Sequence, residues 1–334
     1  MTGARFKIIS AGPLVSFQDA GRRGHLRYGV PASGPMDRFS LAAANAILGQ
    51  DHTKTCIEVS LAGLALQCIE GATVVSIAGG AFRAKFNDQS SEGWAAFPVI
   101  AGDVVKIAAG PWGSWCYVGF SGDVELDPWL QSTSTHSTSG LGGGFLAAGA
   151  EFTVNQTAPV AGRAGGYETP EIATPITTAR IVVGPQDSHF TASALSEISQ
   201  AGFQFTGAFD RMGIRLSGPM LSLNDALSIP SEPITRGSIQ VSGDGVPTIL
   251  MADHQTTGGY PKIATVISAD LDQLAQLRSG DTIRFQPVST SEAIEIYRTR
   301  HWAEVTALDG LSEPALSLEE KLMQSNLISG VITD

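Results

Sequence analysis

Residues 237–267 read GSIQVSGDGVPTILMADHQTTGGYPKIATVI, and this stretch indicates the fold class. Short runs of Val, Ile, Leu and Thr alternate with Gly, Asp and Pro, which is typical of strands separated by turns. The same pattern recurs in TVVSIAGGAF (73–82), DVVKIAAG (103–110), WCYVGFSGDVEL (115–126) and ARIVVG (179–184). Because these runs follow one another closely, they predict β-barrels or sandwiches rather than alternating βαβ units.

Helices are few in this pattern, so the chain is predicted to be mainly β. The segments with helical periodicity are Arg38–Leu48, Thr191–Gln200, Ser291–Val305 and Ser317–Leu327. Asp37 is the expected N-cap of the first, and Asp187 or Ser188 of the second, because short polar side chains accept hydrogen bonds from a helix N-terminus. The two C-terminal helices are expected to cover a sheet edge or a barrel end.

The length of 334 residues favours two domains. A stretch rich in Gly, Pro, Thr and Ala, AGRAGGYETPEIATPITTA (161–179), has little periodicity, and a strand pattern restarts after it. We therefore expect an N-terminal β-rich domain over residues 1–175. A C-terminal domain over residues 176–334 would carry the C-terminal helices.

The charge balance excludes several classes of partner. The chain has 21 basic and 32 acidic residues, a net charge of -11, and no Lys/Arg-rich run, which argues against nucleic acid and anionic membrane surfaces. No apolar run approaches the ~20 residues that cross a bilayer. Charged residues make up 16% of the chain, against about 25% in typical soluble proteins, so we expect another chain to cover part of the surface.

Several chemistries are also excluded by missing motifs. The chain has no nucleotide-binding phosphate loop, no G-x-S-x-G elbow and no H-E-x-x-H, and its six histidines lack ligand spacing, so no metal site is expected. Cys56, Cys68 and Cys116 are odd in number and lie in apolar surroundings, which predicts buried free thiols in a reducing cytoplasm. The N-terminus does not resemble a signal peptide.

Residues 17–37, FQDAGRRGHLRYGVPASGPMD, form a long polar loop with arginine and aromatic anchors, which is typical of a binding loop. Arg27, Ser33 and Asp37 are its candidate substrate-binding residues. The alternative is that Asp37 is only a helix cap and that Gly29 and Gly34 are only turn residues.

Three further features leave alternatives open. The stretch QSTSTHSTSGLGGG (131–144) predicts a mobile loop, which is either an ordinary surface excursion or a cover over a substrate cleft. Asn45 lies among alanines and is expected to fasten its helix to a neighbouring loop if buried. Glu58, in IEVSLAG, is either a solvent-facing residue or a cleft carboxylate.

The densest group of polar side chains lies in and beside DHQTTGGYPK (253–262). Donors, acceptors and a potential cation in one loop favour recognition of a polar small molecule over a plain hairpin turn. Gly258 and Gly259 would allow close approach of a ligand or a positive φ. The candidate substrate-binding residues here are Gln240, Gln255, Thr256, Thr257, Gly258, Gly259 and Tyr260.

At these residues the sequence resembles a known family. The carrying segments are SFQDAGRRGHLRYGVPASGPMDRFSLAAANAILGQD (16–51), GPQDSHFT (184–191), DRMGIRLSG (210–218) and ADHQTTGGYPKIATVISADLDQLAQLRSGD (252–281). Together they resemble the biotin-dependent carboxyltransferase family, also called allophanate hydrolase subunit 2-like or KipA-like, which includes the C-type subunit of bacterial 5-oxoprolinase. The resemblance covers about residues 5 to 300 in the same order.

The resemblance implies two cyclophilin-like β-barrel domains and a KipI-like partner, the B-type subunit of 5-oxoprolinase. It also implies work on a small amide or lactam, either in ATP-dependent 5-oxoproline opening with a LamB/YcsF-type subunit or in carboxyl transfer from carboxybiotin to a urea-like amide. The chain has no biotinylation-type Ala-Met-Lys-Met and no biotin-carboxylase nucleotide motif. No covalently bound cofactor is therefore expected, and carboxybiotin or ATP use would involve a separate biotin carrier, biotin carboxylase or other subunit.

The sequence departs from the family pattern at two arginines. SGLGGGFLAAGAEF lacks the arginine of the usual Gly-Gly-x-x-Gly-Arg run, and His254 replaces the arginine of the common Asp-Arg-Gln-Thr-Thr motif. We expect Lys262 or Arg211 to stabilise developing oxyanion charge, and Asp253 or His254 to accept a proton. Lys262 could instead be a surface lysine at a strand start. The rival function is a non-catalytic KipA-like regulatory protein, and neighbouring genes for the partner types would discriminate between the two.

Overall fold

The computed structural model describes residues 3–87, 89–158, 162–224 and 229–313. The first half contains β1 (Gly3–Ala11), β2 (Ser16–Gln18), η1 (Leu26–Tyr28), α1 (Arg38–Ile47), β3 (Cys56–Ser60), β4 (Leu64–Ala78), β5 (Arg83–Phe86), β6 (Gln89–Glu92), β7 (Ala95–Ile100), β8 (Val104–Ala108), β9 (Trp115–Phe120), β10 (Asp123–Val124), β11 (Glu151–Asn155) and β12 (Gly165–Gly166). The second half contains η2 (Glu171–Ala173), β13 (Thr178–Val183), η3 (Asp187–His189), α2 (Ala192–Gln200), β14 (Gly202–Phe209), β15 (Gly213–Ser217), β16 (Glu232–Pro233), β17 (Ser238–Val241), β18 (Pro247–Leu250), β19 (Thr257–Gly258), β20 (Lys262–Val266), α3 (Leu271–Ala275), β21 (Thr282–Pro287) and α4 (Thr290–Ser312).

The N-terminal strands form one branched sheet centred on β4, whose path runs β10-β11-β1-β4-β8-β5-β6. The 15-residue β4 is long enough to pair also with β7 and β9, so the sheet folds over its own core as a half-barrel. Alternation decides which face is buried: in β1, Phe6 and Ile8 lie in the core, whereas Arg5 and Lys7 face solvent.

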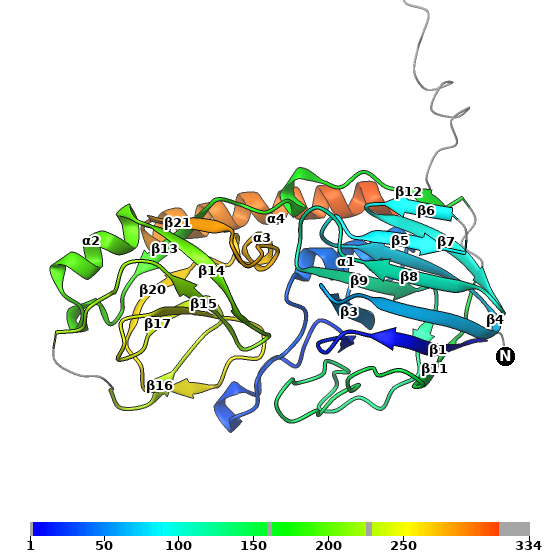
Figure 1. Cartoon of the computed structure of the whole chain (residues 1–334), viewed down its shortest axis with the longest axis horizontal. Helices are drawn as coiled ribbons and strands as arrows, with labels where there is room; N and C mark the ends of the chain where they lie inside the picture. Colours follow the sequence, from blue (N-terminus) through cyan, green and yellow to red (C-terminus); the bar gives the residue numbers. More distant parts are fainter. Residues whose placement is uncertain (1–2, 88, 159–161, 225–228, 314–334) are drawn as a thin grey trace, which may run out of the picture.

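The C-terminal strands close into a barrel in the order β13-β20-β17-β18-β15-β14-β21. All neighbouring pairs are antiparallel except β13 and β21, which close the ring in parallel. Figure 1 shows this barrel beside the N-terminal half, with α4 running along one side of both. The expected fold class, mainly β with a few helices and barrel domains, is confirmed.

The helix predictions hold in part. The first helix is α1, where Asp37 Oδ1 accepts a hydrogen bond from Ser40 N at 2.9 Å. The second is α2, but Thr191 caps it, so the expected capping by Asp187 or Ser188 is wrong; these residues lie in η3 instead. The third is longer than expected and forms α4, and Ser317–Leu327 lies outside the described residues.

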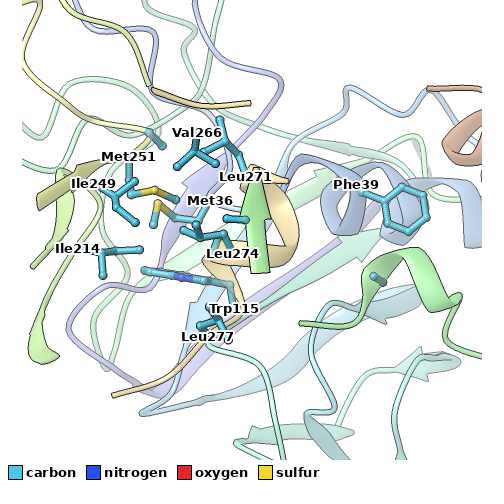
Figure 2. Packing of buried hydrophobic residues seen from close by; sticks show 14 of the residues in the cluster. Met36, Phe39, Trp115, Ile214, Ile249, Met251, Val266, Leu271, Leu274 and Leu277 are labelled. Atoms are coloured by element: carbon cyan, nitrogen blue, oxygen red, sulfur yellow. The ribbon is translucent and has the colours of Figure 1, made fainter. Parts of the chain in front are cut away.

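One hydrophobic core extends from the N-terminal half into the barrel. Figure 2 shows Met36 and Trp115, from the N-terminal half, among Ile214, Met251 and Leu274 of the C-terminal half. The three cysteines are buried and free, as predicted. Among the described residues, no helix combines the length and the apolarity needed to cross a bilayer.

Candidate functional site

Arg211, in the turn between β14 and β15, joins segments that are far apart in the sequence. Its side chain is fully buried, and it donates from Nε to Asp253 Oδ2 at 2.8 Å and from Nη2 to Asp253 Oδ1 at 3.1 Å. The same guanidinium also donates to the Gly34 carbonyl at 2.7 Å and forms an ion pair with Glu58. These contacts make Arg211 a tie between the two halves, a geometry that does not support its expected role as an oxyanion-stabilising group.

Asp253 is held as a charged anchor. Burial raises the pKa of this carboxyl, but the charge and hydrogen bonds of Arg211 and the Ser137 N–H at 2.9 Å outweigh burial and leave the pKa lowered. A carboxylate that is bonded at both oxygens and has a low pKa is a poor proton acceptor. The geometry therefore favours the other candidate, His254.

Glu58 is neither solvent-facing nor open to a cleft. Its side chain is fully buried, and its Oε2 accepts hydrogen bonds from Met36 N at 2.8 Å and from the Tyr117 hydroxyl at 2.7 Å. Burial and the negative charge of Glu58 raise the pKa of Tyr117, so this hydroxyl stays protonated and keeps donating. Glu58 thus fixes the 33–37 loop beneath Arg211.

Asp37 combines two structural roles. Besides capping α1, its Oδ2 accepts hydrogen bonds from Ser40 Oγ at 2.6 Å and from Gln276 Nε2 of the C-terminal half at 2.7 Å. Burial and the nearby carboxylate of Asp272 raise the pKa of Asp37 to about 7. With 1% of its surface exposed, Asp37 cannot contact a substrate in this conformation, and the structure agrees with the helix-cap alternative.

The other two candidates from the N-terminal loop lie apart from each other. Ser33 is buried, accepts a hydrogen bond from Arg22 Nη1 at 3.1 Å, and contributes to the lowered pKa of Asp253. Arg27 is exposed on η1, with its guanidinium 4.7 Å from the Tyr28 ring centre. Within the described ranges, Arg27 forms no hydrogen bond or ion pair with the other candidate residues.

Lys262 begins β20 at the mouth of the barrel and is buried together with the core residues Ile263 and Ala264. It is 4% exposed, so the alternative of a surface lysine is wrong. Its Nζ has no hydrogen-bond partner among the described residues, and Glu232 Oε2 lies 4.0 Å away. Burying an ammonium without a hydrogen bond costs free energy, unless a further group supplies an acceptor.

Gln186 organises this mouth, although the sequence indicated only a helix cap near it. Its Oε1 accepts the Lys262 backbone N–H at 2.9 Å, while its Nε2 donates to Glu232 Oε2. The side chain thereby holds the Glu232 carboxylate on the Lys262 side of the barrel. No sequence signal pointed to Glu232, which lies outside every motif.

His254 has the hydrogen-bonding pattern of a neutral proton acceptor. Its Nδ1 lies 2.6 Å from the Gln255 carbonyl oxygen, and because a carbonyl can only accept, Nδ1 carries the proton. Burial lowers the pKa of the imidazole, which keeps it neutral near pH 7. Its Nε2 forms no hydrogen bond to the part of the chain that the structure describes.

The loop between His254 and Lys262 is held by backbone pairing. Thr257 and Gly258 form β19, which pairs with β16, the strand that carries Glu232. Tyr260 is 44% exposed at the mouth, Thr257 is also exposed, and Gln255 and Thr256 are partly buried. Gln240 is partly buried and lies opposite Lys262 in the sheet, at a β-bulge.

The prediction of a positive φ at Gly258 and Gly259 is wrong, because neither residue has one. A Cβ on Gly259 would lie 2.9 Å from the Ile229 carbonyl oxygen, so this position needs glycine to pack against backbone. A Cβ on Gly258 would lie 3.3 Å from Ile234. Substitution of Gly259 would therefore test packing rather than ligand approach.

The loop at 131–144 is anchored rather than mobile in its first part. Ser132, Ser134 and Thr135 are buried, and Asp19 accepts hydrogen bonds at 2.6 Å from both serine hydroxyls. The following Ser137 reaches Asp253 through its N–H. Through this contact the loop reaches the C-terminal half beside the buried Arg211–Asp253 pair, so it is more than a surface excursion.

Apart from Arg27, most of the described candidates fall into two groups. Arg211, Asp253, Ser33, Glu58 and Asp37 make up the interdomain cluster, which joins the two halves. The second group, the barrel mouth, comprises Lys262, Gln186, Glu232 and the 255–260 loop, which His254 directly precedes in the chain. The described residues include no set of three or more His, Cys, Asp or Glu side chains placed to hold a metal ion.

Residues 28–287 match the family model of the carboxyltransferase domain, subdomains A and B. This chain belongs to the carboxyltransferase domain family. The match spans most of the chain, including both residue groups, and confirms the resemblance carried by the motifs. The carboxyltransferase-domain chain is 34% identical over 306 residues to the C-type subunit of 5-oxoprolinase from Haemophilus influenzae, and the match covers 87% of this chain and 94% of that protein.

Longer proteins contain similar segments. The chain is 28% identical over 331 residues to the urea amidolyase of Lachancea kluyveri, covering 91% of this chain but 18% of the amidolyase. The crystal structure of the Kluyveromyces lactis urea carboxylase superposes with a TM-score of 0.81 at 24% identity, covering 96% of this chain and 30% of the carboxylase. That superposition confirms the fold, and it places the chain against one segment of a larger enzyme.

Proposed function

We propose that this chain is a subunit of an enzyme that processes a small amide or lactam, in the manner of the C-type subunit of 5-oxoprolinase. The similarity to that protein over nearly its whole length supports the proposal. The observation that carries it is the buried ammonium of Lys262 at the barrel mouth, which has no hydrogen-bond partner among the described residues. A substrate carbonyl oxygen would supply the missing acceptor.

The barrel mouth can polarise an amide in two ways. The Lys262 ammonium stabilises negative charge as it develops on the carbonyl oxygen, which is strongest in a site that excludes water. The His254 Nε2 accepts the proton of the substrate N–H, and the Gln255 carbonyl fixes the ring for this transfer. In this assignment Arg211 and Asp253 position the loop and do not contact the substrate.

Polar groups around Lys262 would orient the amide. The Tyr260 hydroxyl and the Thr257 side chain are exposed at the mouth, and the partly buried Gln255 offers both a donor and an acceptor. Thr256 and Gln240 lie at the margins of the same surface. Each would add one oriented hydrogen bond and so contribute to specificity.

Carboxyl transfer is the second candidate function, because the matching family model is a carboxyltransferase domain. The residues present fit a carboxylated cofactor: Lys262 Nζ, 4.0 Å from Glu232, has no hydrogen-bond partner among the described residues and can donate to an anionic group. Carboxybiotin, brought by a separate carrier chain, would supply the carboxyl group when bound. Lys262 would hold it, and His254 would take the proton from the accepting amide nitrogen.

Partner chains are part of the proposal. A KipI-like protein, the B-type subunit of 5-oxoprolinase, would complete the enzyme, with a LamB/YcsF-type subunit and ATP in one case, or a biotin carrier and biotin carboxylase in the other. The low share of charged residues, 16%, supports a surface that a partner covers. The buried free thiols support a reducing cytoplasm as the compartment.

Reconstitution tests the proposal. The chain is purified alone and co-expressed with B-type and LamB/YcsF-type subunits, and each preparation is assayed for ATP-dependent conversion of 5-oxoproline to glutamate and for carboxyl transfer from carboxybiotin. We expect little turnover from the chain alone and one of the two activities from a co-eluting complex. A stable complex that has neither activity would contradict an enzymatic role and support the KipA-like regulatory alternative.

A further inference from the structure

Two adjoining cavities run along α4 and share no lining residue with either residue group described above, although Arg236 of their lining donates to the Pro35 carbonyl beside the interdomain cluster at 3.0 Å. A cavity of about 650 Å³ lies between α4 and the barrel, and one of about 240 Å³ lies between α4 and α1. Ser268 and Tyr297 line both cavities, which together are called here the α4 groove. Its size is typical of small-molecule sites, which often lie where two domains meet.

The α4 groove is cationic although the protein carries a net charge of -11. Two carboxylates line it, and both lie near its arginines: Asp272 Oδ1 is 3.8 Å from Arg236 Nη2, and Glu304 accepts from Arg300 Nε at 2.7 Å. Outside the lining, Glu295 pairs with Arg298 at 2.6 Å. The arginines that line the groove come from five positions of the chain: Arg23, Arg38, Arg236, Arg298 and Arg300. Such a concentration of arginine attracts anions to the groove.

Two of these arginines have an incomplete set of hydrogen bonds. The Arg300 side chain is 10% exposed and that of Arg236 is 8% exposed. Arg300 Nη2 and Arg236 Nε have no hydrogen-bond partner among the described residues. A buried donor without a partner carries a free-energy cost that an added acceptor would remove.

The charge on Arg236 is also poorly compensated. Burial and the like charge of Arg38 lower its pKa to about 10, against the smaller opposite effect of Asp272. The rest of the groove offers apolar surface, including Ile294 and Tyr297, which are 52% and 51% exposed. Cationic and apolar parts therefore lie next to each other in one hollow.

We infer that the α4 groove binds a small organic anion, with its carboxylate or phosphate group against the arginines and its apolar body against Tyr297 and Ile294. This inference goes beyond the proposed function and does not depend on it. It concerns residues that do not line the barrel mouth, and binding rather than turnover is its readout.

Titration calorimetry on the full chain at low ionic strength tests the inference with benzoate, phenyl phosphate and benzamide, the neutral isostere of benzoate. We expect saturable binding of at least one anion and at least tenfold weaker binding of benzamide. The anion that binds more tightly, benzoate or phenyl phosphate, identifies the preferred head group.

Arg38→Ala and Arg298→Ala should each weaken anion binding about tenfold, since each removes a charge-assisted hydrogen bond. Ala293→Phe should abolish binding by filling the apolar part.

Arg83→Ala is the matched control, because Arg83 is an exposed arginine on β5 that pairs with Glu92 at 3.5 Å. Arg83→Ala should bind the anions with the affinity of the unaltered chain. Thermal melts establish that every variant is folded. Equal affinities for benzoate and benzamide, the absence of saturable anion binding, or full affinity in the Arg38, Arg298 and Ala293 variants would each overturn the inference.

Discussion

Arg211 illustrates how single residues join the halves of this molecule. One guanidinium bonds Asp253 of its own barrel and both Glu58 and the Gly34 carbonyl of the N-terminal half. Arg236 does the same nearby, donating to the carbonyl of Pro35 at 3.0 Å. A planar guanidinium group can join several segments because it presents several hydrogen-bond donors in a rigid arrangement.

Asp37 gives a prediction at this scale. Its folded-state pKa, about 7, lies above the ordinary value of 3.8, so the folded state binds the proton more tightly than the unfolded state. The stabilisation from this proton is fully present below about pH 4 and is lost as the pH rises through 7, by at most about 1.4 kcal/mol per pH unit. Asp37→Asn removes this pH-dependent stabilisation, because asparagine does not titrate.

The unaltered chain should therefore lose stability relative to Asp37→Asn as the pH rises. The difference between their free energies of unfolding should be smaller at pH 8 than at pH 5. Urea unfolding at both pH values measures it, and other titrating groups cancel in the difference. A difference that stays constant with pH would show that Asp37 titrates normally in the folded protein.

At the scale of elements, Asp19 is the acceptor that gathers most of the side-chain hydrogen bonds of residues 132–134, while Phe17 holds Thr135 through its carbonyl at 3.0 Å. Burial raises the pKa of Asp19, but hydrogen bonds from Ser132, Ser134 and Thr133 outweigh it and leave the pKa lowered. Hydrogen bonds to a charged acceptor are worth about 1.5–3 kcal/mol each. This acceptor therefore keeps the first part of the loop over the interdomain cluster.

Asp19→Ala should release the loop. We expect amide hydrogen exchange at residues 132–135 to accelerate at least tenfold, while exchange in the barrel strands stays unchanged. Asp244→Ala is the control, since Asp244 is an exposed acid that pairs with Arg215 at the far side of the barrel. Unchanged exchange at 132–135 would mean that the loop is held by other contacts.

Local features were predictable from the sequence, and long-range ones were not. The helix from Arg38 and its Asp37 cap follow from neighbouring residues, and Asn45 fastens α1 to the next loop through the Lys54 carbonyl at 3.0 Å, as expected. The burial of Glu58 depends on Arg211, 153 positions away, so no local pattern could decide between its alternatives. Gln186 and Glu232 are brought to Lys262 in the same way, by barrel closure.

At the scale of the whole molecule, the shared core is the decisive feature. Met36 and Trp115 pack among barrel residues (Figure 2), and Gln276 Oε1 accepts hydrogen bonds from the backbone N–H groups of Ser114 and Trp115 at 2.9 and 3.1 Å. Apolar burial across the junction is lost if either half unfolds. No sequence pattern indicated this shared core, because the composition shift near residue 175 favoured two separate ones.

Thermal unfolding should therefore be a single cooperative transition. We expect one calorimetric peak whose calorimetric and van't Hoff enthalpies agree, since each half loses the shared core when the other unfolds, although the N-terminal half also has a second core of its own. Two resolved peaks, or a half that stays folded after limited proteolysis near residue 170, would contradict a shared core.

Lys262 is the proposed catalytic residue of the barrel mouth, and its substitution tests the proposed function most directly. Lys262→Met keeps most of the length of the side chain, removes the ammonium, and should leave folding intact. The lost charge is buried without a hydrogen bond among the described residues, and Glu232, 4.0 Å away, is half-exposed to solvent. In the reconstituted complex we predict a rate about 10²–10³-fold lower, with an unchanged melting temperature. Lys85→Met, at an exposed position of β5, should retain the full rate. A full rate from the Lys262→Met complex would contradict the account.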